Sequence, residues 1–131
     1  SFLIRVTHSS GMLEGKYTED TVFPPEDHRS HRPRSWLVNG LKKIKSLEFL
    51  TSPESGRSLG QAALLWLLAE KTVASTLPNI YNEEQLIEFT EDKPYLSEDE
   101  LQRVEELFSE NFGVEEDPCN FKGTMERETA A

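Results

Sequence analysis

The sequence has one cysteine, Cys119, among its 131 residues, so an internal disulfide is excluded. A lone cysteine is typical of proteins in a reducing compartment, and we therefore expect a cytoplasmic protein. Long hydrophobic runs are also missing, since no apolar stretch approaches the length of a membrane span. We expect no signal peptide and no membrane partner. Because Ser1 to Ile4 already lie in an apolar run, we expect the chain to be a piece of a longer protein.

Positive charge is scarce in the second half of the sequence. Residues 1–82 contain ten Lys and Arg against eight Asp and Glu, whereas residues 83–131 contain four against sixteen. Without a basic stripe to neutralise phosphates, we expect no nucleic-acid binding. The exception is the segment EDHRSHRPR, which holds Arg29, Arg32 and Arg34 and could attract a small anion.

Hydrophobic periodicity and capping signals predict two strands and four helices. Ser58 with Gln61 and Ser97 with Glu100 form two capping boxes, each at the start of an apolar-periodic segment. The predicted strands cover residues 2–6 and 72–77, and the predicted helices cover residues 35–50, 59–70, 83–89 and 98–108. This order predicts a helix-rich α/β domain over residues 1–114 with two parallel strands, followed by an acidic, irregular tail at 115–131.

Several residues have an ordinary structural interpretation. His28 and His31 have a spacing found in metal sites, but without a second ligand pair a solvated loop is favoured, and we expect no metal. Trp66 lies in a helix that is apolar nearly all round, which favours a core position. Cys119 has no nearby histidine and is a poor nucleophile. The N-terminal strand can have at most one partner strand, so its exposed edge could support self-association.

Four segments in order carry a resemblance to a known family. RVTHSSGMLEGKYT, SLGQAALLWLLAEKTVAS, TLPNIYNEEQLIEF and LSEDELQRVEELF resemble the C-terminal part of an aldo-keto reductase, with its last two βα units and C-terminal helix. Members of that family are (β/α)8 TIM barrels that reduce aldehydes and ketones with NADPH. The resemblance implies a partial barrel in which residues 2–6 and 73–77 are the seventh and eighth strands.

The resemblance also implies a cofactor site for NADP(H) or NAD(H). The family's aromatic residue that stacks on nicotinamide is replaced by Arg5, whose guanidinium plane can also stack. The pyrophosphate would run along Val6, His8, Ser10 and Gly11. The helix after Pro78 resembles the one that receives the adenosine 2′-phosphate.

At that helix the family's residues are matched only in part. Its Lys, its Arg and its Glu fall on Asn79, Gln85 and Glu88, and a further polar position on Tyr81. Because both cations are replaced, we expect any preference for the 2′-phosphate to depend on Arg29, Arg32 and Arg34.

The family's catalytic Asp, Tyr, Lys and His lie on earlier strands, so the resemblance implies no catalytic residue in this chain. We therefore interpret the chain as a piece of an NAD(P)H-dependent oxidoreductase, with the remaining N-terminal part of the barrel as its partner. The alternative is a free-standing helical interaction or structural module without enzymatic activity.

Overall fold

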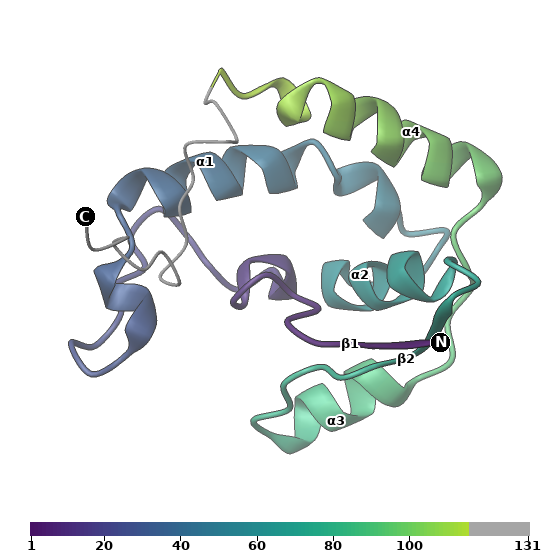
Figure 1. Ribbon diagram of the computed structural model, residues 1–131, viewed down its shortest axis with the longest axis horizontal. Helices are drawn as coiled ribbons and strands as arrows, with labels where there is room; N and C mark the ends of the chain where they lie inside the picture. Colours follow the sequence, from purple (N-terminus) through teal and green to yellow (C-terminus); the bar gives the residue numbers. More distant parts are fainter. Residues whose placement is uncertain (116–131) are drawn as a thin grey trace, which may run out of the picture.

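The computed structural model describes residues 1–115 and confirms the predicted fold class (Figure 1). Two parallel strands and four α-helices form a helix-rich arrangement consistent with part of an α/β barrel. The predicted tail lies outside the described residues except for Glu115, and Cys119 lies outside them too. The elements are β1 (Phe2–Ile4), α1 (Arg34–Lys45), α2 (Leu59–Leu68), β2 (Val73–Thr76), α3 (Glu83–Thr90) and α4 (Glu98–Ser109), with 3₁₀ turns η1 (Met12–Glu14), η2 (His28–His31), η3 (Glu48–Thr51) and η4 (Asn111–Gly113).

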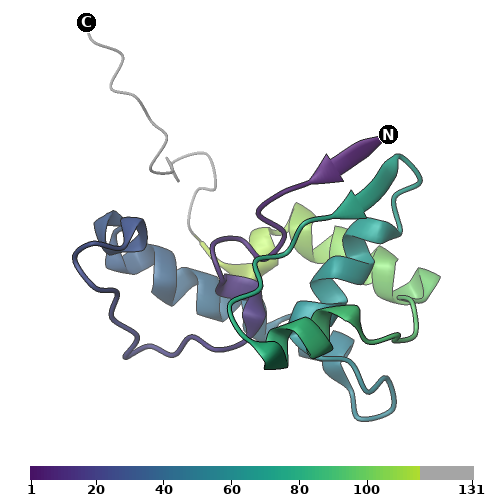
Figure 2. The ribbon, with the colours of Figure 1, turned by 90° about the horizontal axis from the view of Figure 1, so that it is seen from below.

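The two strands form one parallel pair joined by a crossover that contains α1 and α2. Leu3 is opposite Ser75 and Ile4 is opposite Thr76, with an irregularity between Phe2 and Leu3. Both arrows point the same way in Figure 2, so the segments that follow the two strands leave from one edge of the sheet.

The first strand is shorter than the sequence predicts. β1 ends at Ile4, and Val6 has a φ of 55°. A β-branched residue rarely adopts this left-handed conformation, and such a conformation cannot continue a strand. The composition of residues 2–6 is strand-like throughout, so composition alone does not predict that β1 ends at Ile4.

The helix starts agree closely with the predicted ones. Both capping boxes form, since the Ser58 and Ser97 side chains accept from the backbone N–H of Gln61 and Glu100 and those side chains accept in return. The predicted helix over residues 35–50 is divided, because α1 ends at Lys45 and η3 follows. At the break the Ser46 hydroxyl donates to the carbonyl of Lys43 at 2.5 Å, a local bond that competes with the helical ladder.

The core lies between α2, α4 and η3. Leu50, Ala62, Leu96 and Val104 are buried together. Around them pack the partly buried side chains of Leu47, Phe49, Leu65 and Leu101. Leu96, the residue before the Ser97 cap, packs into the same cluster as Leu101, and such a contact across a helix start is a hydrophobic staple.

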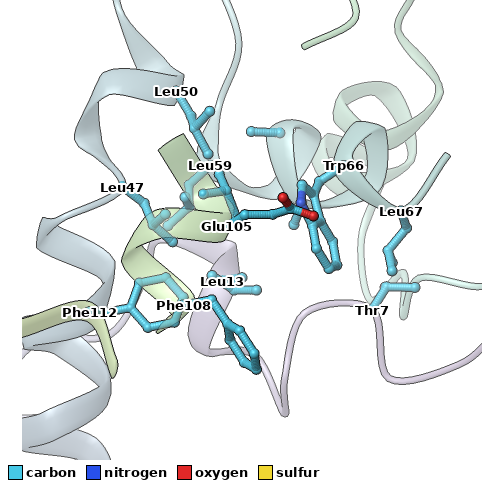
Figure 3. A pocket seen from close by; sticks show the side chains of 13 residues that line it. Thr7, Leu13, Leu47, Leu50, Leu59, Trp66, Leu67, Glu105, Phe108 and Phe112 are labelled. Atoms are coloured by element: carbon cyan, nitrogen blue, oxygen red, sulfur yellow. The ribbon is translucent and has the colours of Figure 1, made fainter. Parts of the chain in front are cut away.

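Trp66 does not lie in the core, contrary to the prediction. Its side chain is 44% exposed and lines an apolar groove of about 360 Å³ between α2 and the end of α4. Figure 3 shows its ring among the side chains that line the groove, which include Glu105 and Phe108 of α4. The sequence showed that α2 is apolar on several faces, but no element within residues 1–115 fills this groove.

Candidate functional site

The buried side chain of His8 anchors the loop after β1 to the helices that pack against it. The Nε2–H of His8 donates to the carbonyl of Gly60 at 2.9 Å, and its ring stacks on Phe89 with centroids 4.7 Å apart. His8 is 4% exposed. The structure therefore places this imidazole toward α2 and α3, where it fixes the loop instead of facing solvent. Sequence reasoning placed the same residue along a pyrophosphate.

Beyond His8 the loop has a strained backbone. Ser9, Ser10 and Gly11 have φ angles of 51°, 59° and 88°. A left-handed conformation is costly for the two serines, and the neighbouring structure must hold them there. The hydroxyl of Tyr17 does so in part by donating to the carbonyl of Ser10 at 2.7 Å.

The start of α3 lies on the same edge as this loop and is already partly occupied by internal bonds. Asn82 caps the helix by accepting from the Gln85 N–H at 2.9 Å. The Gln85 side chain, 2% exposed, accepts from the Tyr81 N–H at 2.9 Å and donates to Glu14 at 3.4 Å. The side chain of Gln85 is thus used to join α3 to η1.

Glu88 also makes its contacts inside the protein. Its carboxylate accepts from the hydroxyl of Ser58 at 2.5 Å, and its carbonyl accepts from the Gln61 side chain at 2.8 Å. These bonds connect α3 to the first turn of α2. In contrast, Arg5, Val6, Asn79 and Tyr81 are exposed near the ends of the two strands.

The arginine loop, residues 27–34, is brought against the loop after β1. Arg32 donates to the hydroxyl of Ser10 at 3.1 Å and its guanidinium lies 4.6 Å from the centroid of the Trp36 ring. Arg29 donates to the hydroxyl of Tyr17, which itself contacts Ser10. Of the three predicted arginines, one therefore contacts the loop after β1 directly and another contacts it through Tyr17.

Arg34 is oriented differently and donates to the carbonyl of Thr21 at 2.6 Å. It points toward the segment that precedes η2 instead of toward Ser10. The side chains of the arginine loop thus contact two different segments, the loop after β1 and the segment around Thr21. The three cations do not converge on one atom of the β1 loop.

Sequence reasoning missed two residues that organise this loop. Asp27 binds the guanidinium of Arg29 through both oxygens and caps η2 by accepting from the Arg29 N–H. Hydrogen bonds from Arg29 hold the pKa of Asp27 well below its usual range and raise that of Arg29 in return. Burial raises the pKa of Tyr17, although Arg29 opposes the shift. The spacing of Asp27 two residues before Arg29, typical of an Asx turn, was the available signal.

The described residues hold neither a cluster of metal-ligating side chains nor a membrane-spanning helix. Within residues 1–115 there is no group of three or more His, Cys, Asp or Glu side chains placed to hold a metal ion. His28 lies 3.7 Å from Asp27 and is exposed. Over the same residues no helix has both the length and the apolar character that a membrane crossing requires.

Comparisons with known proteins agree with this arrangement. The aldo/keto reductase family model matches residues 4–108. A probable voltage-gated potassium channel subunit beta from Oryza sativa subsp. japonica is 32% identical over 85 residues, which are 61% of this chain and 26% of that protein. The matched stretch therefore spans about a quarter of the relative's length. No solved structure matches the chain. Since the family model covers most of the sequence, the chain belongs to the aldo/keto reductase family.

Proposed function

We propose that this chain is the C-terminal, cofactor-binding part of an NAD(P)H-dependent oxidoreductase that reduces carbonyl groups to alcohols. The observation that carries the proposal is the parallel β1–β2 pair, after which the β1 loop and the approach to α3 leave from one edge. Active sites of TIM barrels lie at this edge, often with a phosphate site after the seventh and eighth strands and at a short helix start. A cytoplasmic location and pairing with the N-terminal part of the barrel belong to the same proposal.

The exposure of the residues near the strand ends supports a set of contacts along the cofactor. Arg5 is exposed just beyond β1, where its guanidinium plane is available to stack on the nicotinamide ring. The backbone of Ser10 and Gly11 follows, and glycine permits a close approach of the pyrophosphate. His8 supports this loop from beneath through its bond to Gly60.

The adenosine end would lie over the start of α3. Asn79 and Tyr81 are exposed there, whereas the side chains of Gln85 and Glu88 are held by internal hydrogen bonds. The first turn of α3 contains Glu83 and Glu84, which oppose a phosphate at the helix start. Discrimination between NADPH and NADH therefore falls to the arginine loop.

Dinucleotide binding by the natural full-length protein tests the proposal. NADPH and NADH are titrated while the quenching of protein fluorescence is followed, first with the wild type and then with Arg5→Ala. We expect both dinucleotides to bind and Arg5→Ala to weaken both alike, because nicotinamide is common to them. Arg103→Ala is the matched control, since Arg103 lies on α4 over the ring of Phe49. Saturable binding of neither dinucleotide would overturn the proposal.

The free-standing helical module is not favoured. The family model begins at the last residue of β1, covers the whole of β2 and runs into α4, so the match is not restricted to the helices.

A further inference from the structure

We propose that the pocket between residues 21–23, η2 and the start of α1 binds a phosphate group, either inorganic phosphate or a phosphate monoester. The pocket has a volume of about 170 Å³, and one of its lining residues, Arg32, contacts Ser10 in the loop after β1. If the bound monoester is the adenosine 2′-phosphate of NADPH, this proposal rests on the proposed function and extends it. The pocket's binding of phosphate alone does not depend on that function.

The charge of the pocket wall is unusual for this chain. Arg29, Arg32 and Arg34 all line it, and no acidic residue within residues 1–115 does. The whole sequence has 24 acidic and 14 basic residues, so a wall with cations only is a local departure from the chain's charge. Such a wall favours an anion over a neutral ligand.

The three arginines of this wall have different bonding partners. Arg29 is neutralised by Asp27, with which it forms a salt bridge of 2.5 Å. Arg32 donates to the hydroxyl of Ser10 and lies over the ring of Trp36. Arg34 binds only a backbone carbonyl, that of Thr21, and no carboxylate within residues 1–115 lies within salt-bridge distance of it. Arg34 therefore carries positive charge that the described residues do not compensate, on a side chain already fixed at one nitrogen.

The start of α1 adds to the same field. Pro33, Arg34 and Trp36 line the pocket and form the cap and the first turn of this helix. Within residues 1–115 no side chain caps the helix, and its first turn contains no acidic residue. The partial positive charge of a helix start is thus not neutralised here. It is a better setting for an anion than α3, which has Glu83 and Glu84 in its first turn and Asn82 as its cap.

Hydrogen bonds connect the pocket wall to the loop after β1. Arg32 reaches from the pocket wall to the hydroxyl of Ser10, and Arg29 reaches Tyr17, which holds the Ser10 carbonyl. A phosphate bound between Arg32 and Arg34 would therefore fix the loop along which the proposed cofactor runs. This connection makes the adenosine 2′-phosphate the relevant monoester among those that the charge would accept.

The 131-residue chain is titrated with sodium phosphate, adenosine 2′-monophosphate and adenosine 5′-monophosphate at constant ionic strength, and amide and indole NMR shifts are followed. We expect saturable shifts at Arg34, Trp36 and Phe23 with phosphate. Arg34→Ala should weaken this binding roughly tenfold to hundredfold, the range of one charge-assisted hydrogen bond. Sodium chloride at the same ionic strength should produce no saturable shift.

Two further variants keep the result clear. Val22 lines the pocket and is 83% exposed, so Val22→Asp introduces a carboxylate at the rim without disturbing packing and should abolish the phosphate shifts. Arg103→Ala on α4 should leave them unchanged. No saturable shift with phosphate in a folded wild-type chain, or unchanged affinity in both Arg34→Ala and Val22→Asp, would overturn the proposal.

The titrations with the two adenosine monophosphates distinguish the cofactor from inorganic phosphate as the natural ligand. Tighter binding of the 2′-monophosphate than of the 5′-monophosphate and of phosphate supports the cofactor as the source. Equal binding of all three supports inorganic phosphate. Failure of the full-length protein to bind dinucleotides, with phosphate still bound here, would overturn only the proposed function.

Discussion

The guanidinium of Arg57 forms an ion pair with the carboxylate of Glu100 and so joins the start of α2 to the start of α4. Only 3% of the Arg57 side chain is exposed. Its Nε–H donates to the Leu50 carbonyl at 3.2 Å, and its Nη1 donates to the carbonyls of Pro94 and Tyr95 at 3.1 Å each. The buried cation is tolerated because each of its nitrogens has an acceptor.

We predict that Arg57→Met lowers the free energy of unfolding by about 3 kcal/mol or more, because the change leaves three carbonyls and a carboxylate without their donor. Arg103→Met, on α4, is the control and should cost less, since Arg103 stacks on Phe49 and no salt bridge to it is found within residues 1–115. Urea denaturation followed by circular dichroism measures both. Equal, small losses for the two variants would show that the ion pair adds little.

Low pH should weaken the ion pair between Arg57 and Glu100. Burial acts to raise the pKa of Glu100, but hydrogen bonds from Ser97 and Arg57 outweigh it and lower the pKa below the ordinary value of 4.5. A lowered folded-state pKa gives stability that is present above the unfolded value and is lost as the pH falls through the folded one. We therefore expect the melting temperature to fall below about pH 4.5, and to fall less steeply in Glu100→Gln.

The control for this pH profile is Glu98→Gln, which removes an exposed acid from the same helical turn without touching Arg57. Its profile should keep the steepness of the wild type. If Glu98→Gln flattens the acid branch as much as Glu100→Gln does, the helix dipole is the cause and the ion pair is not.

The features predictable from the sequence are those set by neighbouring residues. The caps at Ser58 and Ser97 are bonds between a side chain and the backbone three residues on, so local sequence determines them. Features set by tertiary contacts were missed. The early end of β1 and the exposed position of Trp66 depend on how distant segments pack, which a periodic pattern cannot show.

The candidate site shows the same limit. His8, Gln85 and Glu88 were predicted to line a cofactor, and all three use their side chains in hydrogen bonds that join the β1 loop, η1, α2 and α3. A polar residue that binds a ligand and one that braces a loop are indistinguishable in a single sequence. The hydrogen-bond partners of these three residues lie up to 71 positions away, so the sequence alone could not predict them, and their contacts with a cofactor stay a prediction.

The contact between α2 and α3 at Gly60 should not tolerate a side chain. A Cβ there would lie 2.8 Å from the ring of Phe89 and 3.1 Å from the carboxylate of Glu88. We predict that Gly60→Ala destabilises the chain by about 1–3 kcal/mol through overpacking, despite the better helix propensity of alanine. Adding Phe89→Leu should recover part of that loss in thermal unfolding. A Gly60→Ala chain that is more stable than the wild type would contradict this close packing.

The 131-residue chain alone should not reduce carbonyl compounds. The resemblance implies that the family's proton-donating Tyr and its Asp, Lys and His partners lie on earlier strands, and Tyr81 and Tyr95 are both about 70% exposed on separate segments. Loss of general acid catalysis removes on the order of two to four decades of rate. We expect no oxidation of NADPH above background with a generic aldehyde. Steady turnover by the purified chain that survives removal of trace contaminants would refute the prediction.

The open edge of β1 should make the isolated chain self-associate. Phe2, Leu3 and Val6 are 61–65% exposed, and β2 is the only strand paired with β1 within residues 1–115. An apolar strand edge with free backbone groups is a template for pairing with a second chain. Sedimentation velocity at increasing concentration should show dimers or larger species, and Leu3→Lys should shift the chain toward monomer.

The groove beside α4 is the competing surface for this association, so its variant serves as the control. Phe108 is 75% exposed on the groove wall, and Phe108→Lys removes an apolar contact there without touching the strand. If the strand edge is the interface, Phe108→Lys leaves the association unchanged, and hydrogen exchange across residues 2–6 slows as the concentration rises. Association lost in Phe108→Lys and kept in Leu3→Lys would assign the interface to the groove, because a charge at the β1 edge should oppose strand pairing and have no effect on a contact made elsewhere.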